Sequence, residues 1–274
     1  MIKLIALDLD GTLLNSETRI SAEDGRALEE AAEKGIVIVP CTGRFYRSMP
    51  EELRALPFIR YAILMNGAEI YDISEKKALY SADISSERAD EVFSLLEKEP
   101  CIYDCYFDDW GWMQKSMHEK AALYAAGPKY LELLLKFRKP VENLRDYVRE
   151  RGGSVQKIQC YCRKKEDRER AFEKLREKFP DMNITSSLSN NVEINAHDAD
   201  KGAVMLKLCG ILGIKREESM AIGDGINDIT LMEKAGFSVA MGNAIQKLKD
   251  SADFITDTND QSGVGKAIRH LMTD

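Results

Sequence analysis

The amino-acid sequence predicts an α/β fold in which a parallel-sheet core is interrupted by an inserted α+β domain. Near both ends of the chain, short apolar runs alternate with helix-like segments, which is typical of parallel strand-helix-strand units. The middle of the chain instead alternates apolar and polar residues, as antiparallel hairpins do. The 274 residues are enough to build both domains around hydrophobic cores.

The first third of the chain supplies three expected strands and two expected helices. Each strand is an apolar run of the kind that is buried on both faces: "KLIALDL" (3–9), "IVIVPCT" (36–42) and "YAILMNG" (61–67). Ser21 is expected to cap a helix that ends at Gly35, and a second helix is expected near residues 44–55.

The parallel pattern resumes at Lys201. Expected strands are "SMAIGD", "FSVAM" and "DFIT", and expected helices cover residues 201–212, 226–235, 244–251 and 260–272. The parallel-sheet core is therefore predicted to comprise residues 1–82 and 188–274.

The inserted domain is predicted over residues 83–187. The surface hairpin "AEIYDISEKKALYSADI" leads into it, and "CIYDCYFDDWGWMQK" predicts a second hairpin with its turn at Asp108 and Asp109. The other expected elements are helices at 85–98, 118–136, 141–151 and 165–178 and strands at 154–162 and 182–188. A further strand is expected at 191–195, beyond the predicted end of the insert.

The charge and the lengths of the apolar runs argue against several classes of protein. The formal net charge is -7, and Asp and Glu are interleaved with every cluster of Lys and Arg, which argues against a general binder of nucleic acid or membrane surfaces. No apolar run approaches the roughly 18 residues of a membrane span, and the N-terminus lacks the pattern of a signal peptide. A cytoplasmic protein is expected.

The six cysteines include no CxxC pair and are expected to be reduced residues of the core or of strands. Cys160 and Cys162 share one face of an expected strand. Only three histidines are present, so a zinc site built from His and Cys is not favoured.

Polar side chains and glycines follow several expected strands, at the point where each strand ends. They are Asp8 and Asp10, Thr42-Gly43-Arg44, Asn66-Gly67, and Gly223-Asp224-Gly225 followed by Asn227 and Asp228. Ligands of open parallel sheets bind at this carboxyl edge. Two carboxylates about 4 Å apart repel by roughly 4 kcal/mol at an effective dielectric constant of about 20. A divalent cation that prefers oxygen ligands, such as Mg²⁺, would offset this repulsion.

Two aspartates separated by one residue can divide the work of phosphoryl transfer. One of Asp8 and Asp10 can act as a nucleophile and the other as a general acid. Thr42 and the neighbouring amides can hydrogen-bond to a phosphoryl oxygen, and Lys201 can offset developing negative charge. Each motif alone is also typical of an ordinary turn or helix cap. Their joint occurrence at strand and helix termini favours a catalytic site.

Taken together, the motifs resemble the haloacid dehalogenase superfamily, specifically its Cof-like sugar-phosphatase branch (subclass IIB). The matching segments are "DLDGTLL", "CTGR", "DADKG" and "IGDGINDITLMEKAG". The resemblance covers the whole chain, because "MNGAEIYD", "VAMGNA" and "NDQSGVGKAI" are also similar to that branch. It implies a Rossmann-like parallel sheet core with an inserted α+β cap domain, which closes over the site and supplies substrate contacts.

The resemblance also implies a role for each residue. Asp8 would attack phosphorus and form an aspartyl-phosphate, while Asp10 would protonate the leaving oxygen and later activate water. Mg²⁺ would be held by the Asp8 carboxylate, the Asp10 main-chain carbonyl and Asp224, with Asp228 bound directly or through water. The candidate phosphate-binding residues are Asp8, Gly11, Thr42, Gly43, Arg44, Lys201 and Asn227.

Two roles have alternatives that the sequence leaves open. Arg44 lies beside Thr42, and it could contact substrate or form a salt bridge with a nearby acidic side chain. Aromatic residues of the insert could pack on a substrate ring, or they could form the core of the insert, which is favoured: Tyr103, Tyr106, Phe107, Trp110 and Trp112.

The sequence therefore predicts a Mg²⁺-dependent phosphatase that hydrolyses small phosphorylated metabolites, with sugar phosphates expected from the resemblance. One alternative is a phosphotransferase or phosphomutase, which would pass the same phosphoryl group to a sugar hydroxyl instead of water. Another is a phosphometabolite-binding regulator that has lost catalysis. Release of inorganic phosphate without an acceptor sugar would distinguish the first from hydrolysis, and binding without turnover would identify the second. The sequence does not set the oligomeric state.

Overall fold

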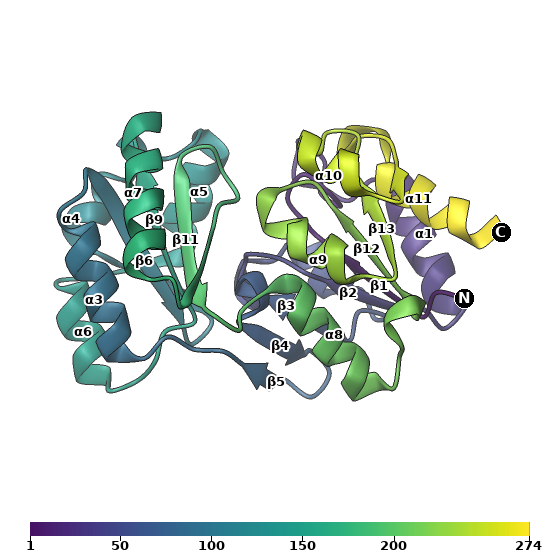
Figure 1. The fold of residues 1–274 in the computed structure, drawn as a ribbon, viewed down its shortest axis with the longest axis horizontal. Helices are drawn as coiled ribbons and strands as arrows, with labels where there is room; N and C mark the ends of the chain where they lie inside the picture. The colour runs from purple at the N-terminus through teal and green to yellow at the C-terminus, as the bar shows by residue number, and fades with distance from the viewer. Residues whose placement is uncertain (274) are drawn as a thin grey trace. The chain divides into compact units, whose positions relative to one another are not determined.

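The computed structural model describes residues 1–273, which divide into two compact units (Figure 1). The first unit contains Met1–Arg44, Met49–Tyr80 and the chain from Asp200 onward. The second contains Ser81–Ala199 together with the short segment Phe45–Ser48. Among the described residues, no helix is long and apolar enough to cross a membrane.

The first unit is built on a parallel sheet, as predicted, and this sheet has five strands. Its strand order is β14-β13-β12-β1-β2, and every neighbouring pair is parallel. The strands are β1 (Leu4–Leu7), β2 (Val37–Pro40), β12 (Ser219–Gly223), β13 (Phe237–Ala240) and β14 (Phe254–Ile255). All residues of β1 and β12 are buried, which explains their continuous apolar sequences. Segments from the two ends of the chain thus complete a single sheet.

The third expected strand lies beside β2 but pairs mainly elsewhere. Strand β3 (Tyr61–Leu64) is joined to the first sheet by a parallel bridge between Cys41 and Ile63. It then forms a three-stranded sheet with β4 (Glu69–Asp72) and β5 (Lys77–Ser81), in which β3 and β4 are antiparallel. Strands β4 and β5 are neighbours in this sheet and are joined by residues 73–76, so the expected surface hairpin is present.

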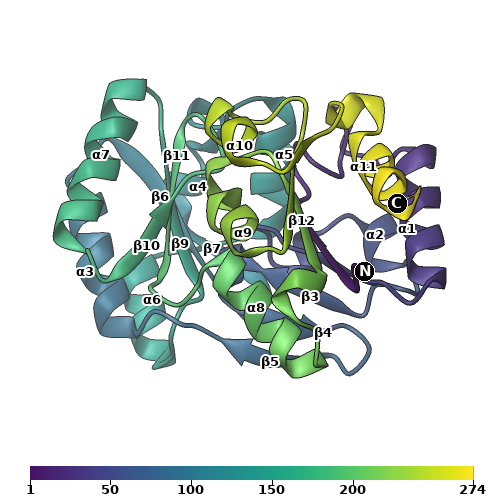
Figure 2. The same ribbon diagram turned by 45° about the vertical axis from the view of Figure 1, so that its right-hand side comes forward.

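Six α-helices among the described residues belong to the first unit. They are α1 (Ala22–Glu33), α2 (Glu51–Arg54), α8 (Lys201–Leu212), α9 (Ile229–Lys234), α10 (Gln246–Ser251) and α11 (Gly263–Thr273). Ser21 caps α1 as predicted, because its side chain accepts a hydrogen bond from the Asp24 amide. Helices α1 and α11 lie side by side (Figure 2), and Asp24 joins them by accepting a hydrogen bond from the Gly265 amide at 2.7 Å.

The helix expected at 44–55 is wrong in extent. The chain instead forms the 3-10 turn η1 (Tyr46–Ser48) and the single-turn helix α2. Pro50 lies between them at the N-cap of α2. Because proline has no amide proton and its ring clashes with the preceding turn, it prevents one continuous helix.

The second unit contains a six-stranded sheet of order β10-β11-β9-β6-β7-β8. The strands are β6 (Cys101–Phe107), β7 (Trp110–Gln114), β8 (Arg138–Val141), β9 (Lys157–Cys162), β10 (Met182–Thr185) and β11 (Asn191–Ala196). Apolar residues from one face of this sheet pack with residues of α3 (Ser86–Leu96), α6 (Leu144–Arg151) and α7 (Lys165–Lys178). An α+β insert is therefore present, as predicted.

The aromatic residues of the insert mostly belong to this core. Tyr103, Tyr106 and Phe107 are buried, and Phe107 stacks on Trp112 with ring centroids 5.2 Å apart. Trp110 is only partly buried, and the guanidinium of Arg47 lies 4.6 Å from its ring centroid. The favoured interpretation of these residues as core is confirmed for Tyr103 and Phe107, whereas Tyr106 is buried outside this core, with its hydroxyl beside Arg138 and Gln159.

Local features of the second unit follow from turn residues. Asp108 and Asp109 have φ angles of 53° and 57° and form the predicted hairpin turn. The helix expected at 118–136 is broken into α4 (Lys115–His118), η3 (Ala121–Leu123) and α5 (Pro128–Phe137). The break before α5 follows from Gly127 and Pro128, since proline is favoured at the first position of a helix and not inside one.

The second unit extends further than the predicted end at residue 187. The strand expected at 191–195 is present as β11, but it lies in the second unit and not in the core segment 188–274. It pairs antiparallel with both β9 and β10, so the chain stays in the second unit to Ala199.

Candidate active site

Lys201 joins two aspartates at the carboxyl edge of the parallel sheet. Asp8 directly follows β1, Asp228 lies in the 3-10 turn η5 (Ile226–Asp228) after β12, and Lys201 is the first residue of α8. The ammonium nitrogen of Lys201 donates to Asp8 Oδ1 and to Asp228 Oδ1, each at 2.7 Å. All three side chains are buried, so this ion triad is shielded from water.

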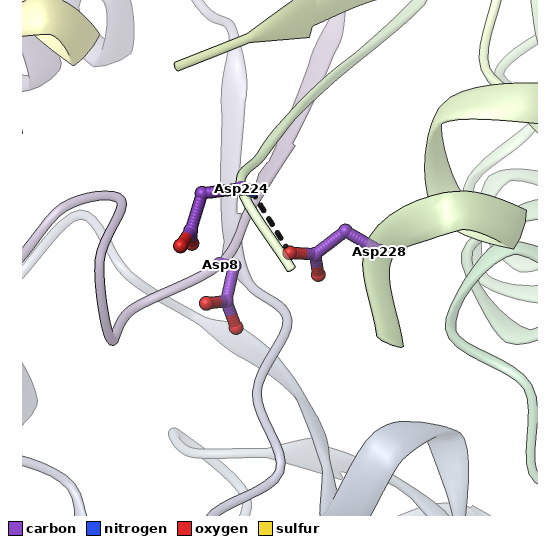
Figure 3. Close-up of side chains that lie close together, drawn as sticks. All are labelled: Asp8, Asp224 and Asp228. Atoms are coloured by element: carbon purple, nitrogen blue, oxygen red, sulfur yellow. Dashed lines mark hydrogen bonds between the residues drawn. The ribbon is translucent and has the colours of Figure 1, made fainter. Parts of the chain in front are cut away.

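Asp224 completes a compact group of three carboxylates. Figure 3 shows Asp8, Asp224 and Asp228 close together on three different segments, and one oxygen of each lies within 4.8 Å of the others. The Thr12 hydroxyl donates to Asp224 Oδ1 at 2.8 Å. Asp228 Oδ2 accepts hydrogen bonds from the amides of Asp224 and Gly225 at 3.0 and 2.9 Å. Both oxygens of Asp228 are thereby occupied by protein donors.

The electrostatics of this group favour a bound cation. Burial raises the pKa of Asp8 well above its usual range, and the neighbouring carboxylates add to the effect of burial, which Lys201 only partly offsets. Burial and the charge of Asp228 raise the pKa of Asp224 to about 7. One ammonium group balances one of three negative charges, so a divalent cation with oxygen ligands would complete the charge balance.

Two glycines allow these groups to approach one another. Gly11 has a φ of +85°, and a Cβ atom there would lie 2.4 Å from Asp224 Oδ2. A Cβ on Gly202 would lie 2.0 Å from the carbonyl oxygen of Thr230, where α8 packs against α9. This close packing brings Lys201 to Asp228, which explains the glycine in the motif "DKG".

The N-terminus of α8 is fixed by the hydrogen bonds of Asp200 and by close packing against Gly67. The Asp200 side chain caps the helix by accepting a hydrogen bond from the Ala203 amide at 2.7 Å, and it also accepts one from Lys234 at 3.0 Å. Gly67 has a φ of +99°, and a Cβ there would lie 2.8 Å from the Asp200 backbone. Lys201 therefore projects from a fixed helix end.

Asp10 lies outside the group of three carboxylates and faces Arg44. Arg44 Nε donates to Asp10 Oδ2 and Nη2 donates to Oδ1, both at 2.7 Å. The Arg44 side chain is 12% exposed and that of Asp10 is 36% exposed. Of the two alternatives for Arg44, the salt bridge is the one present in this structure.

Thr42 connects the neighbouring loops. Its hydroxyl oxygen accepts a hydrogen bond from the Arg44 amide at 3.2 Å, its own amide donates to the Ile63 carbonyl, and its carbonyl accepts from the Asn66 amide. The Asn227 side chain donates to Asn66 Oδ1 at 3.3 Å, which links η5 to the loop after β3. Gly43 lies between Thr42 and Arg44. These hydrogen bonds bring the predicted residues together at one edge of the first unit.

Three residues that organise this edge were not assigned a role from the sequence. Thr12 binds Asp224, Asn66 binds Asn227, and Asn243 donates to the Gly11 carbonyl at 2.7 Å. Thr12 could have been found, because it is part of the first motif, "DLDGTLL". The other two act through the pairing of loops that are distant in sequence.

The chain belongs to the haloacid dehalogenase-like hydrolase family, whose characteristic sequence pattern it matches over residues 5–268. It is a phosphatase of the Cof-like branch of that family, in keeping with the resemblance of its motifs.

Similar proteins support this assignment. The chain is 35% identical to the 5-amino-6-(5-phospho-D-ribitylamino)uracil phosphatase YcsE of Bacillus subtilis over 99% of this chain and 96% of that protein. A solved haloacid dehalogenase-like hydrolase from B. subtilis superposes with a TM-score of 0.86 at 30% identity, covering 98% of this chain and all of that one. A subclass IIB sugar phosphatase shares the fold at 24% identity, with a TM-score of 0.82 over 99% and 100% of the chains.

Proposed function

We propose that this protein is a Mg²⁺-dependent phosphatase that hydrolyses small phosphorylated metabolites through an aspartyl-phosphate. The observation that carries the proposal is the ion triad of Lys201 with Asp8 and Asp228, next to Asp224. This arrangement supports the proposal, because Asp8 would be the carboxylate nucleophile, Lys201 the cation for the phosphoryl oxygens and Asp224 an acidic ligand of the metal, all at one sheet edge.

The residues present fit a magnesium ion, because the available ligands are carboxylate and carbonyl oxygens. Asp8 and Asp224 would hold it through their carboxylates and Asp10 through its main-chain carbonyl. Asp228, whose oxygens are already engaged, would take part through water. When bound, the ion would neutralise charge on the transferring phosphoryl group.

Asp8 would attack phosphorus, forming a bond between its carboxylate oxygen and phosphorus as the bond to the leaving oxygen breaks. Asp10 in its protonated form would give a proton to that leaving oxygen. It would then, as the carboxylate that Arg44 binds, take a proton from the water that attacks the aspartyl-phosphate. The second step releases inorganic phosphate and restores both carboxyl groups. Lys201, held 2.7 Å from Asp8, would stay beside the reacting oxygen throughout.

The phosphoryl group would be bound by the segments that meet at this edge. Thr42 would donate a hydrogen bond from its hydroxyl group to a phosphoryl oxygen, since the hydroxyl oxygen already accepts a hydrogen bond from the Arg44 amide. The backbone at Gly11 and Gly43 and the Asn227 amide would complete the binding site. Arg44 would act on Asp10 through their salt bridge and would approach the phosphate only if that bridge opened.

The proposed substrates are phosphate monoesters of sugars and of sugar-alcohol compounds. The phosphatase YcsE, whose substrate carries a phosphoribityl group, supports the second class, and the resemblance of the motifs supports the first. Specificity for one compound would be set outside the residues that bind the phosphoryl group.

Phosphate release tests the proposal. Wild type and Asp8→Asn would be assayed with p-nitrophenyl phosphate, hexose phosphates, pentose phosphates and 5-amino-6-(5-phospho-D-ribitylamino)uracil, with Mg²⁺ and with EDTA. Release that requires Mg²⁺ and disappears in Asp8→Asn is expected. Release that persists in Asp8→Asn would refute the nucleophile, and release only after an acceptor sugar is added would identify a phosphotransferase.

A further inference from the structure

Three cysteines gather at one end of the paired strands β6 and β9. Cys101 begins β6 and Cys162 ends β9, and the antiparallel register places them directly opposite each other. Residues that are directly opposite in such a pair project from the same face. Cys160 lies two residues before Cys162 on β9 and therefore shares this face.

The spacing of the strands suits a covalent bond between the opposite pair. Directly opposite residues in antiparallel strands have Cα atoms about 4.5 to 5.5 Å apart. Disulfides span Cα separations of about 4.4 to 6.8 Å. Both thiols are free in this structure, so the pair can form a bond with little movement of the backbone. Cys160 lies opposite Tyr103 instead, which makes it a diagonal neighbour of Cys101.

The two thiols differ in ways that suit oxidation. Hydrogen bonds from the thiols of Cys101 and Cys160 lower the pKa of Cys162 below its usual range, which favours the nucleophilic thiolate. Cys101 is partly exposed, whereas Cys162 is buried, so a small oxidant can enter at Cys101. Cys105 is on the same strand and face but is buried opposite Ile158, and it has no thiol across from it.

We propose that Cys101 and Cys162 form a reversible oxidation site in the second unit, where a hydroperoxide converts the two thiols into a disulfide. The sulfur of Cys162 attacks one peroxide oxygen, the O–O bond breaks, and a sulfenic acid and one water form. The sulfur of Cys101 then displaces the sulfenic hydroxyl as a second water and forms the S–S bond. With hydrogen peroxide, two thiols and one peroxide give one disulfide and two waters. Dithiothreitol reverses the reaction.

Peptide mapping tests the site. Folded protein would be treated with hydrogen peroxide, its remaining thiols alkylated, and the chain unfolded and cut with trypsin without reductant. Cleavage at Lys and Arg yields peptides 99–115 and 158–163. The expected product is these two peptides joined, two hydrogen masses below their sum, and separated again by dithiothreitol.

Each peptide contains two cysteines, so serine variants identify the bonded pair. Cys101→Ser and Cys162→Ser are expected to lose the joined peptides, whereas Cys105→Ser and Cys160→Ser are expected to keep them. Absence of the joined peptides in oxidised wild type would overturn the proposal, as would their persistence in Cys101→Ser or their appearance only after unfolding. Circular dichroism of each variant confirms that it is folded before oxidation.

Discussion

The guanidinium of Arg44 binds both carboxylate oxygens of Asp10, with two nitrogen-oxygen distances of 2.7 Å. A bidentate pair of this kind fixes the orientation of the carboxyl group as well as its distance. Asp10 is more exposed than Asp8, so without Arg44 its side chain would have room to rotate. We infer that Arg44 is a positioning residue for the proposed general acid.

Arg44→Lys should therefore reduce catalysis, because an ammonium group cannot bind both oxygens. We expect kcat to fall by about 10- to 100-fold with alkyl phosphates, which need a proton on the leaving oxygen, and by less with p-nitrophenyl phosphate. Arg47→Lys, at an arginine three residues further on, is the control and should change neither rate. Equal losses with both substrates would contradict a role through Asp10.

Lys201→Met should destabilise the fold, because it leaves two buried carboxylates without their ammonium partner. Loss of one partner of a buried ion pair costs about 3 to 5 kcal/mol of unfolding free energy. Urea denaturation without metal measures this, and adding Asp8→Asn to Lys201→Met should recover part of the loss. Lys207→Met on the same helix, at a residue that lies over the Tyr80 ring, should cost much less. No recovery in the double variant would show that the two side chains are not coupled.

Gly202→Ala tests the contact between α8 and α9. A Cβ would lie 2.0 Å from a backbone oxygen, so the helices must separate, at a cost of about 1 to 3 kcal/mol in unfolding free energy. Activity should also fall, since Lys201 moves with the helix. Gly210→Ala on the same helix meets no atom within 4 Å and should stabilise by up to about 1 kcal/mol. Similar melting temperatures for the two variants would argue against the close packing.

Asp72 should make the fold sensitive to acid. Its burial alone would raise the pKa, but hydrogen bonds from the Ser74 hydroxyl, the Glu75 amide and Arg60 lower the pKa to about 2. A carboxyl with a lowered pKa stabilises the fold above its unfolded-state value near 3.8, and this stabilisation is lost as the pH falls from about 4 to 2.

Because Arg60 is about half exposed, we expect a contribution of roughly 1 to 2 kcal/mol rather than the full value of the shift. Asp72→Asn should therefore lower the unfolding free energy at pH 6 and have little effect at pH 2. Denaturation curves at both pH values measure the difference. An equal effect at both would mean that the charge of Asp72 is not what stabilises the fold.

Magnesium should stabilise the folded protein, because it binds carboxylates that are brought together only by folding. A rise in melting temperature with increasing Mg²⁺ is expected for wild type and should be much smaller for Asp224→Asn. Asp250→Asn, on helix α10 away from the acidic group, is the control. A rise of the same size in Asp224→Asn would place the ion elsewhere.

The sequence predicts best the position of side chains that directly follow a strand or begin a helix. Asp8, Lys201 and Asp228 could be brought together because each stands at a predicted terminus on the same edge of a parallel sheet. The orientation of Arg44 could not be predicted, since a guanidinium near several acids can pair with any of them. Strand β11 was assigned to the core segment because its sequence predicts a strand but does not name its partners, which are β9 and β10.

The segment Phe45–Ser48 belongs to the second unit although it immediately follows Arg44. Phe45 is buried there, with its ring centroid 5.1 Å from that of Tyr106. The backbone therefore passes between the units four times, after Arg44, Ser48, Tyr80 and Ala199. A simple insertion would require only two such passages. Deleting residues 81–199 would remove the aromatic residues that contact the Phe45 ring. The second unit therefore cannot be exchanged between proteins by replacing residues 81–199 alone.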